Sequence, residues 1–376
     1  MNKNFFIDLF CGAGGMSCGL EMSGFTCLMG IDSDKYAVDT FGRNHRSAIP
    51  ICSSIEKITT ESIKEIVGDR SIKLICGGPP CQGFSCLGKG DPSDERNFLF
   101  LEFLRIVEAI NPEYVLIENV VGLMAKKNQN TVLSIIYSLE QLGYSVNVEI
   151  LKAHHYGVPQ KRRRVFFLAN RVHKNNNFPK IQFNDEDDLL PNYNTVQYAW
   201  DNWLTDGYHC YNHDLIAAAK MSEIDIQRLS YIPEGKGIRY QKEMREYLPE
   251  KLWYNVDWLT IRESRLREYR LQRLNSNICS PTISSQSTYY HPTENRRLTQ
   301  REVAAIQSFP ASYIFSGSNT QQRKQIGNAV PPLLAKAIGE AILQNDQQPS
   351  VSITTQRKSA DFVDHIHRLR SVAFAY

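Results

Sequence analysis

Short apolar runs and amphipathic stretches alternate through roughly the first 170 residues. Strands alternating with helices predict an α/β fold with a doubly wound, mostly parallel sheet. The connection between the last two strands is too short for a helix, so we expect these strands to pair antiparallel at one edge. The expected strands are 5–9, 27–31, 72–76, 114–117, 145–151 and 164–169, and the expected helices are 16–23, 35–41, 60–67, 99–109 and 131–142.

The composition and periodicity of the sequence change beyond this region, which indicates a second, smaller domain. Asn, Asp and Pro become frequent, and all four tryptophans lie in a stretch with little clear periodicity. Two helical patterns then return, and the second of them, in "GNAVPPLLAKAIGEAIL", is expected to pack on the first sheet. The predicted division is 1–172, 173–295, 296–345 and a tail at 346–376 to which no role is assigned.

Composition excludes some classes of protein. No apolar run approaches the roughly 18 residues of a membrane span, and the N-terminus lacks the pattern of a signal peptide. The nine cysteines are therefore expected to be reduced thiols of a cytoplasmic protein. The net charge is only +3, but residues 260–301 carry eight arginines against three glutamates, which favours a polyanionic partner.

The segment "IDLFCGAGG" at 7–15 reads as a strand, a glycine-rich turn and a helix start. A dinucleotide fingerprint would need a third glycine where Ser17 stands, so a nicotinamide oxidoreductase is disfavoured. Asp32 ends the next strand, where an acid can accept hydrogen bonds from a ribose. Together with Asp8 it suggests a nucleoside-like cofactor. The alternative is that Asp32 only caps the following helix.

Two chemically active residue types follow neighbouring strands. "GGPPCQGFS" places Cys81 after one strand, and Glu118 ends the next strand, "YVLIENV". Ligands of such sheets bind at the carboxyl ends of the strands. A half-buried carboxyl there can be held protonated. The pair is therefore interpreted as a nucleophile and an acid.

Structural, metal-binding and redox roles are the alternatives for the cysteines. Cys11, Cys27, Cys76 and Cys279 are expected to be buried apolar side chains. The spacing of Cys76, Cys81 and Cys86 fits no common zinc pattern, so no metal is expected. Neither Cys-x-x-Cys nor the His-x-Glu of a zinc deaminase occurs in the chain.

At this point the chain resembles the bacterial DNA (cytosine-5)-methyltransferases of the restriction–modification type, over almost its whole length. The similar segments occur in the family's order: "DLFCGAGG", "GGPPCQGFS", "ENV", "QKRRR", "RLTQREVAAIQSFP" and "QIGNAVPP". The resemblance implies the fold of S-adenosylmethionine-dependent methyltransferases. It makes 1–172 the catalytic and cofactor-binding domain and 173–295 a target-recognition domain.

The resemblance also implies roles for individual residues. Cys81 would add to carbon 6 of a flipped-out cytosine, Glu118 would contact N3 and the exocyclic amine, and Arg162 would bind the base carbonyl with Arg164 in support. Where the family often has a bulky apolar residue and an acid at the adenine, this chain has Ser33 and Ser54, so the adenine is expected against Ile55 or Phe10. The residues expected to bind S-adenosylmethionine, with S-adenosylhomocysteine as product, are Phe10, Gly12, Gly14, Gly15, Asp32, Ser33, Ser54, Ile55, Pro80 and Asn328.

Double-stranded DNA is the expected partner, with a cognate restriction endonuclease acting separately and the enzyme itself a monomer. The segment 280–297 is expected to include base-contacting residues. Two rival functions stay open: a tRNA cytosine-5 methyltransferase on the same fold, and a non-catalytic DNA-binding module. The residues expected to bind DNA are Gln82, Ser85, Arg262, Arg265, Arg296 and Arg297.

Overall fold

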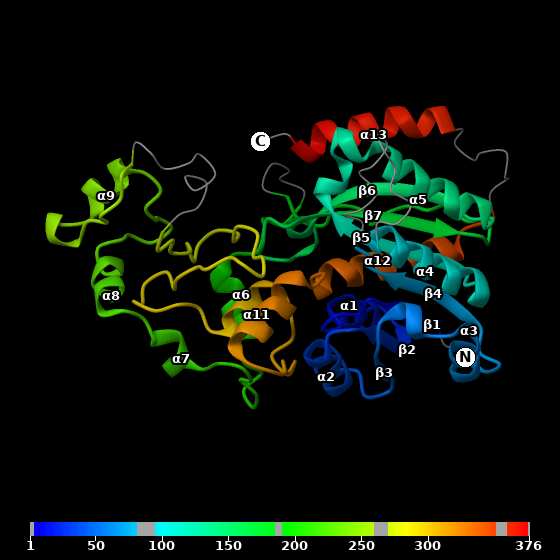
Figure 1. Ribbon diagram of the computed structural model, residues 1–376, viewed down its shortest axis with the longest axis horizontal. Coiled ribbons are helices and arrows are strands. Elements are labelled where there is room, and N and C mark those ends of the chain that lie inside the picture. Colours follow the sequence, from blue (N-terminus) through cyan, green and yellow to red (C-terminus); the bar gives the residue numbers. More distant parts are fainter. Residues whose placement is uncertain (1–3, 81–94, 185–189, 259–269, 351–358, 375–376) are drawn as a thin grey trace. The chain divides into compact units, whose positions relative to one another are not determined.

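The computed structural model describes residues 4–80, 95–184, 190–258, 270–350 and 359–374 (Figure 1). The chain divides into two compact units. Unit 1 comprises Met1–Tyr156, Arg162–Gln182 and Ala329–Tyr376, and unit 2 comprises Gly157–Lys161 and Phe183–Asn328. Within the described ranges, no helix has the length and apolar character needed to cross a membrane.

Unit 1 contains a seven-stranded sheet, and helices connect many of its strands. Its strands are β1 (Asn4–Leu9), β2 (Phe25–Asp32), β3 (Ile49–Cys52), β4 (Ile72–Gly77), β5 (Tyr114–Val120), β6 (Ser145–Lys152) and β7 (Arg163–Asn170). Its helices are α1 (Gly15–Met22), α2 (Lys35–Asn44), α3 (Thr60–Val67), α4 (Glu95–Ile110), α5 (Gln129–Gln141), α12 (Pro332–Gln347) and α13 (Ser359–Phe374). Short 3₁₀ segments are η1 (Ile55–Lys57), η2 (Val121–Met124), η3 (Lys126–Asn128) and η4 (Ala153–Tyr156).

The strand order is β3-β2-β1-β4-β5-β7-β6, which confirms the predicted mostly parallel, doubly wound sheet. The strands β1 to β5 pair in parallel, and β7 pairs antiparallel with both β5 and β6. The antiparallel pairing of the last two strands at the β6 edge is therefore also confirmed. The edge strand β3 was not predicted, because "IPIC" is short, largely exposed and interrupted by a proline.

A large apolar cluster lies between the sheet and α3, α4, α5 and α13. The tail, to which no structure was assigned from the sequence, supplies α13, whose Ile366, Leu369 and Ala373 are buried in this cluster. Elsewhere in unit 1, the returning helix α12 packs closely on α1, whereas the sequence predicted packing on the sheet. A Cβ at Gly19 would stand 2.1 Å from the Pro332 carbonyl oxygen, so only glycine permits this approach.

Unit 2 consists of short helices joined by irregular chain around a smaller core. Its arginines hold much of the irregular backbone: fully buried Arg301 donates to the carbonyls of Phe309, Pro310, Ala311 and Tyr313. These bonds satisfy carbonyl groups that have no strand or helix partner. Its helices are α6 (Val196–Trp203), α7 (Leu215–Ala219), α8 (Glu223–Leu229), α9 (Gln241–Tyr247), η5 (Glu250–Leu252), α10 (Gln300–Ile306) and α11 (Asn319–Asn328).

The two units differ from the division expected from the sequence. Residues 296–328 belong to unit 2, and the tail belongs to unit 1. The physical reason is packing, since α10 contacts α6 and α11, whereas α13 joins the core of the sheet.

Candidate active site

The carboxyl ends of β1, β2 and β3 collect most of the predicted cofactor-binding residues at adjacent positions of the sheet. Gly14 caps α1 in a left-handed conformation, with φ 84°, and Gly15 begins that helix. Gly12 also has positive φ, 52°, and no atom lies within 4 Å of where its Cβ would be. The turn is therefore open above its backbone. Phe10 adopts φ 68°, which is strained for a residue other than glycine.

The Asp32 carboxylate ties this turn to the end of β2. It accepts hydrogen bonds from the backbone N–H groups of Gly12 and Asp34, both at 2.9 Å. The cap of α2 is Asp34, which accepts from Tyr36 and Ala37. The interpretation of Asp32 as a mere helix cap is therefore wrong. A carboxylate can accept about four hydrogen bonds, so Asp32 keeps acceptor capacity for a ligand.

The remaining cofactor candidates lie in different surroundings. Ser33 is exposed after β2, Ile55 is buried in η1, and Pro80 is exposed in the loop after β4. The Ser54 hydroxyl donates a hydrogen bond to the Glu56 carboxylate. Glu56 therefore brings a carboxylate next to the position where the family often has an acid and this chain has Ser54. Asn328 ends α11 in unit 2.

Asp8 lies inside unit 1 beneath the glycine turn and is 1% exposed. It accepts a hydrogen bond of 2.5 Å from the Ser17 hydroxyl. Burial raises the pKa of Asp8 to about 7, against the lowering effect of this hydrogen bond. Asp8 therefore links the end of β1 to α1 through Ser17.

Glu118, Arg162 and Arg164 form one cluster near the ends of β5 and β7. Antiparallel pairing sets Val120 opposite Arg164, so the Arg164 side chain reaches Glu118 diagonally. Arg164 Nε lies 2.7 Å from Glu118 Oε1. Burial raises the pKa of Glu118, and the charges of Arg164 and Arg162 oppose this effect. Arg162 is fully buried, and burial lowers its pKa to about 9.

The loop leading to Cys81 is attached to this cluster by a residue that sequence reasoning did not single out. Asn119 Nδ2 donates to the Pro79 carbonyl at 3.0 Å. A Cβ on Gly78 would lie 3.1 Å from Glu118 Oε2, so the glycine lets the loop pass close to the carboxylate. Asn119 follows Glu118 in "ENV", and the abrupt change from apolar to polar residues could have indicated it. Cys81 itself lies outside the described residues.

The predicted DNA contacts divide into three groups. Gln82, Ser85, Arg262 and Arg265 lie outside the described residues. Arg296 does not match the predicted role as a DNA contact. It is buried and donates hydrogen bonds to both Glu302 and Glu294, so its charge is paired within unit 2. Arg297 is exposed in unit 2.

Comparison with known proteins connects this geometry to a family. The family model of C-5 cytosine-specific DNA methylases matches residues 5–344. The chain is 32% identical to the Type II methyltransferase M1.HphI of Haemophilus parahaemolyticus, over 90% of this chain and 86% of that protein. It is 32% identical to the Type II methyltransferase M.DdeI of Desulfomicrobium norvegicum, over 93% of each chain.

Solved structures agree on the fold. A prophage-encoded protein of E. coli, assigned as a DNA modification methyltransferase, superposes with a TM-score of 0.68 at 24% identity, covering 92% of this chain and 99% of that chain. The Entamoeba histolytica methyltransferase EhMeth gives a TM-score of 0.61 at 16% identity, covering 93% of this chain and 100% of that chain. The chain belongs to the C-5 cytosine-specific DNA methylase family, and with it to the DNA (cytosine-5-)-methyltransferases.

Proposed function

We propose that this protein transfers a methyl group from S-adenosylmethionine to carbon 5 of cytosine at a specific site in double-stranded DNA. The observation that carries the proposal is the cluster of Glu118 with Arg164 and Arg162, beside the loop that leads to Cys81. A buried carboxyl flanked by two arginines next to a cysteine loop suits acid-assisted nucleophilic addition to a ring.

Cys81 acts first, as a thiolate that adds to carbon 6 of the pyrimidine. Glu118 donates a proton or a hydrogen bond to N3, so the negative charge of the adduct does not build up on the ring. A positioned acid of this kind contributes roughly 10²–10⁴ in rate. Arg162 stabilises the base carbonyl, and Arg164 orients the Glu118 carboxylate through the 2.7 Å contact. Carbon 5, made electron-rich by this addition, takes the methyl group that S-adenosylmethionine would supply. Loss of the carbon-5 proton to solvent then returns that electron pair to the ring, the bond between carbon 6 and sulfur breaks, and Cys81 leaves as a thiolate.

The residues at the glycine turn fit a nucleoside-bearing cofactor. The open space above Gly12 would admit it, Asp32 would accept from ribose hydroxyls, and Phe10 or Ile55 would lie against the adenine. Gly14, Gly15, Ser33, Ser54, Pro80 and Asn328 complete the proposed set. S-adenosylmethionine, when bound, supplies an electrophilic methyl group on a sulfonium.

The target cytosine must leave the duplex to reach Cys81, at a cost of roughly a few kcal/mol. Arginines of unit 2 would offset this cost through contacts with DNA. By analogy with relatives named Type II methyltransferases, we propose that the enzyme is cytoplasmic and protects host DNA beside a separate restriction endonuclease.

The test is tritiated methyl transfer to plasmid DNA and to tRNA, followed by bisulfite sequencing of plasmid from expressing cells. We expect radioactive duplex DNA and one short sequence protected from conversion. Label confined to tRNA would contradict the DNA assignment, and binding of duplex without any transfer would assign a non-catalytic module. The Cys81→Ser variant is the control, since it should bind DNA and transfer nothing.

A further inference from the structure

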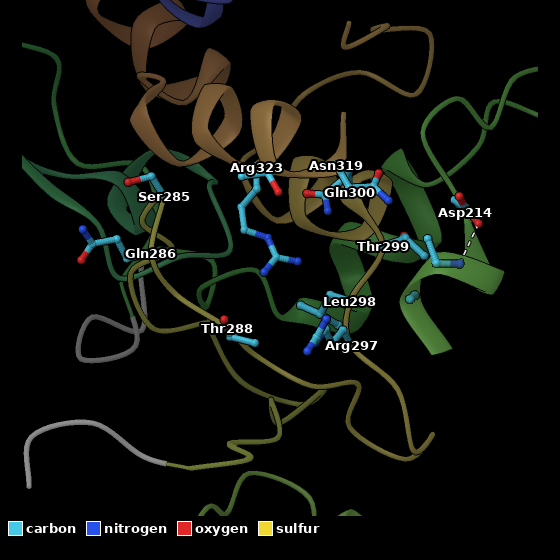
Figure 2. Close-up of a pocket in the computed structure, with 13 residues that line it drawn as sticks. Asp214, Ser285, Gln286, Thr288, Arg297, Leu298, Thr299, Gln300, Asn319 and Arg323 are labelled. Carbon is cyan, nitrogen blue, oxygen red and sulfur yellow. Dashed lines mark hydrogen bonds between the residues drawn. The ribbon is translucent and has the colours of Figure 1, made fainter. Parts of the chain in front are cut away.

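Unit 2 contains a polar pocket of about 300 Å³ that has no part in the chemistry above (Figure 2). Its lining comes from the start of α11, from the chain around α10, from α7 and from the segment 285–288. Arg297, Arg323 and Gln300 are its central polar side chains in Figure 2. Part of the wall therefore belongs to 280–297, the segment expected to face DNA.

The wall at 285–288 is held rigidly against α11. A Cβ at Gly327 would stand 2.3 Å from the backbone nitrogen of Ser285, so the glycine allows direct contact of loop and helix. A chain of buried amides continues the support. Gln160 Oε1 accepts from Ile283 N–H at 3.0 Å, Gln160 Nε2 donates to Gln307 Oε1 at 2.8 Å, and Gln307 Nε2 donates to the Ile326 carbonyl at 2.7 Å. The pocket is thus preformed.

The charge in the pocket is not balanced from within. Among the described residues, neither Arg297 nor Arg323 makes a salt bridge. The single carboxylate of the described lining, Asp214, is exposed and accepts from Ala217 N–H as the cap of α7. Burial and the neighbouring Arg297 both lower the pKa of Arg323. Exposed Arg297 and partly buried Arg323 therefore place two cations in one pocket, which favours an anion between them.

The uncharged residues of the lining also favour a bound anion. Gln300 is 5% exposed, and its Oε1 has no hydrogen-bond partner among the described residues. Buried polar groups are normally satisfied, so this amide is left for a ligand or water. Rotation about its last bond would present the NH₂ group instead. Asn319 and Thr320 bring in the N-terminal end of the ten-residue helix α11, where the helix dipole favours negative charge.

We propose that this pocket binds one phosphodiester group of the DNA backbone between Arg297 and Arg323, with the Gln300 amide as a third donor. The inference rests on the proposed function, because it names how unit 2 holds its DNA. A phosphate contact positions the protein without reading a base. The pocket therefore sets the register of the target site independently of Glu118 and its cluster.

The experiment measures DNA affinity against salt for the wild type and for Arg297→Gln/Arg323→Gln, on the cognate duplex and on one with an altered site. Losing one phosphate contact should reduce the slope of log K against log [salt] by about 0.9. Between about 50 and 200 mM salt the wild-type affinity should then fall about 3.5-fold more than that of the variant. Cognate and altered duplexes should be weakened equally.

Arg43→Gln is the control, because it removes one arginine charge by the same substitution from an exposed position on α2 of unit 1 and should leave the slope unchanged. An unchanged slope in the double variant would overturn the proposal, and so would weakening limited to the cognate duplex, which would indicate base reading. Inorganic phosphate could instead raise the melting temperature of the wild type and of Arg43→Gln but not of the double variant, while the salt slope of DNA binding is unchanged. That result would overturn the proposal and assign the pocket to a free anion. If the wild type binds and methylates DNA and the double variant keeps the full salt slope, this inference alone is refuted. If the wild type has no transferase activity, the proposed function is refuted.

Discussion

The buried carboxyl of Asp8 makes the stability of unit 1 depend on pH in a way that one substitution should remove. Its pKa is raised from 3.8 to about 7, chiefly by burial. A raised pKa means that the folded protein favours the neutral acid. The stability this neutral form provides is fully present below about pH 4, the unfolded pKa, and is lost as pH rises through about 7. Asn at this position stays neutral throughout and keeps an oxygen for the Ser17 hydroxyl.

The magnitude follows from the two pKa values. At about 1.4 kcal/mol for each tenfold change in proton affinity, a pKa raised from 3.8 to about 7 makes the ionised form about 4 kcal/mol less favourable in the folded chain. Between about pH 5 and pH 8 the wild type should lose about 3 kcal/mol relative to Asp8→Asn.

Urea denaturation of both proteins across this pH range, followed by a probe in unit 1, measures the difference. Asp39→Asn is the control, since Asp39 is half exposed on α2 and pairs with Arg43 at the surface. A difference between the wild type and Asp8→Asn that stays constant from about pH 5 to pH 8 would show that the acid does not titrate as its burial requires.

Three further substitutions test other parts of the structure. Glu118→Gln should reduce the rate of methyl transfer by roughly 10²–10⁴ while calorimetry shows S-adenosylmethionine binding unchanged; a rate close to wild type would exclude Glu118 as the acid. Arg164→Met removes the charge that lowers the Glu118 pKa, so the limb of the pH–rate profile due to Glu118 should move to higher pH, and a shift to lower pH would contradict the pairing. Leu369→Ala should destabilise unit 1 by about 2–5 kcal/mol in thermal or urea unfolding, because Leu369 anchors α13 in the core, whereas no loss would mean that α13 does not pack there.

Sequence pattern predicted the parts of the fold that have strong periodicity. The strands around Ile7, Leu74 and Val115 are apolar runs bounded by turn residues, and the helix 60–67 was predicted with the bounds that the structure gives it. The edge strand β3 has four residues, three of them exposed, and so it left no apolar signal. The helix α13 carries its core residues at Ile366, Leu369 and Ala373, but this helical spacing is surrounded by polar residues.

Residue type and position along the strands were enough to predict part of the candidate site. The positions of Glu118, Asp32 and the glycine turn at strand ends follow from the order of strands and turns. The engagement of Arg296 with Glu302 and Glu294 could not be predicted, because Arg297 beside it has the same charge and lies on the surface. Pairing in three dimensions decides which arginine remains available.

The most direct measurement is a trapping experiment at Cys81. A duplex with 5-fluorocytosine in the recognition sequence found by bisulfite sequencing is incubated with protein and S-adenosylmethionine. Fluorine at carbon 5 cannot leave as a proton does, so the bond from the Cys81 sulfur to carbon 6 should persist and give a protein–DNA species that survives denaturation. Absence of that species with the active wild type, or its formation by Cys81→Ser, would contradict covalent catalysis by this thiol.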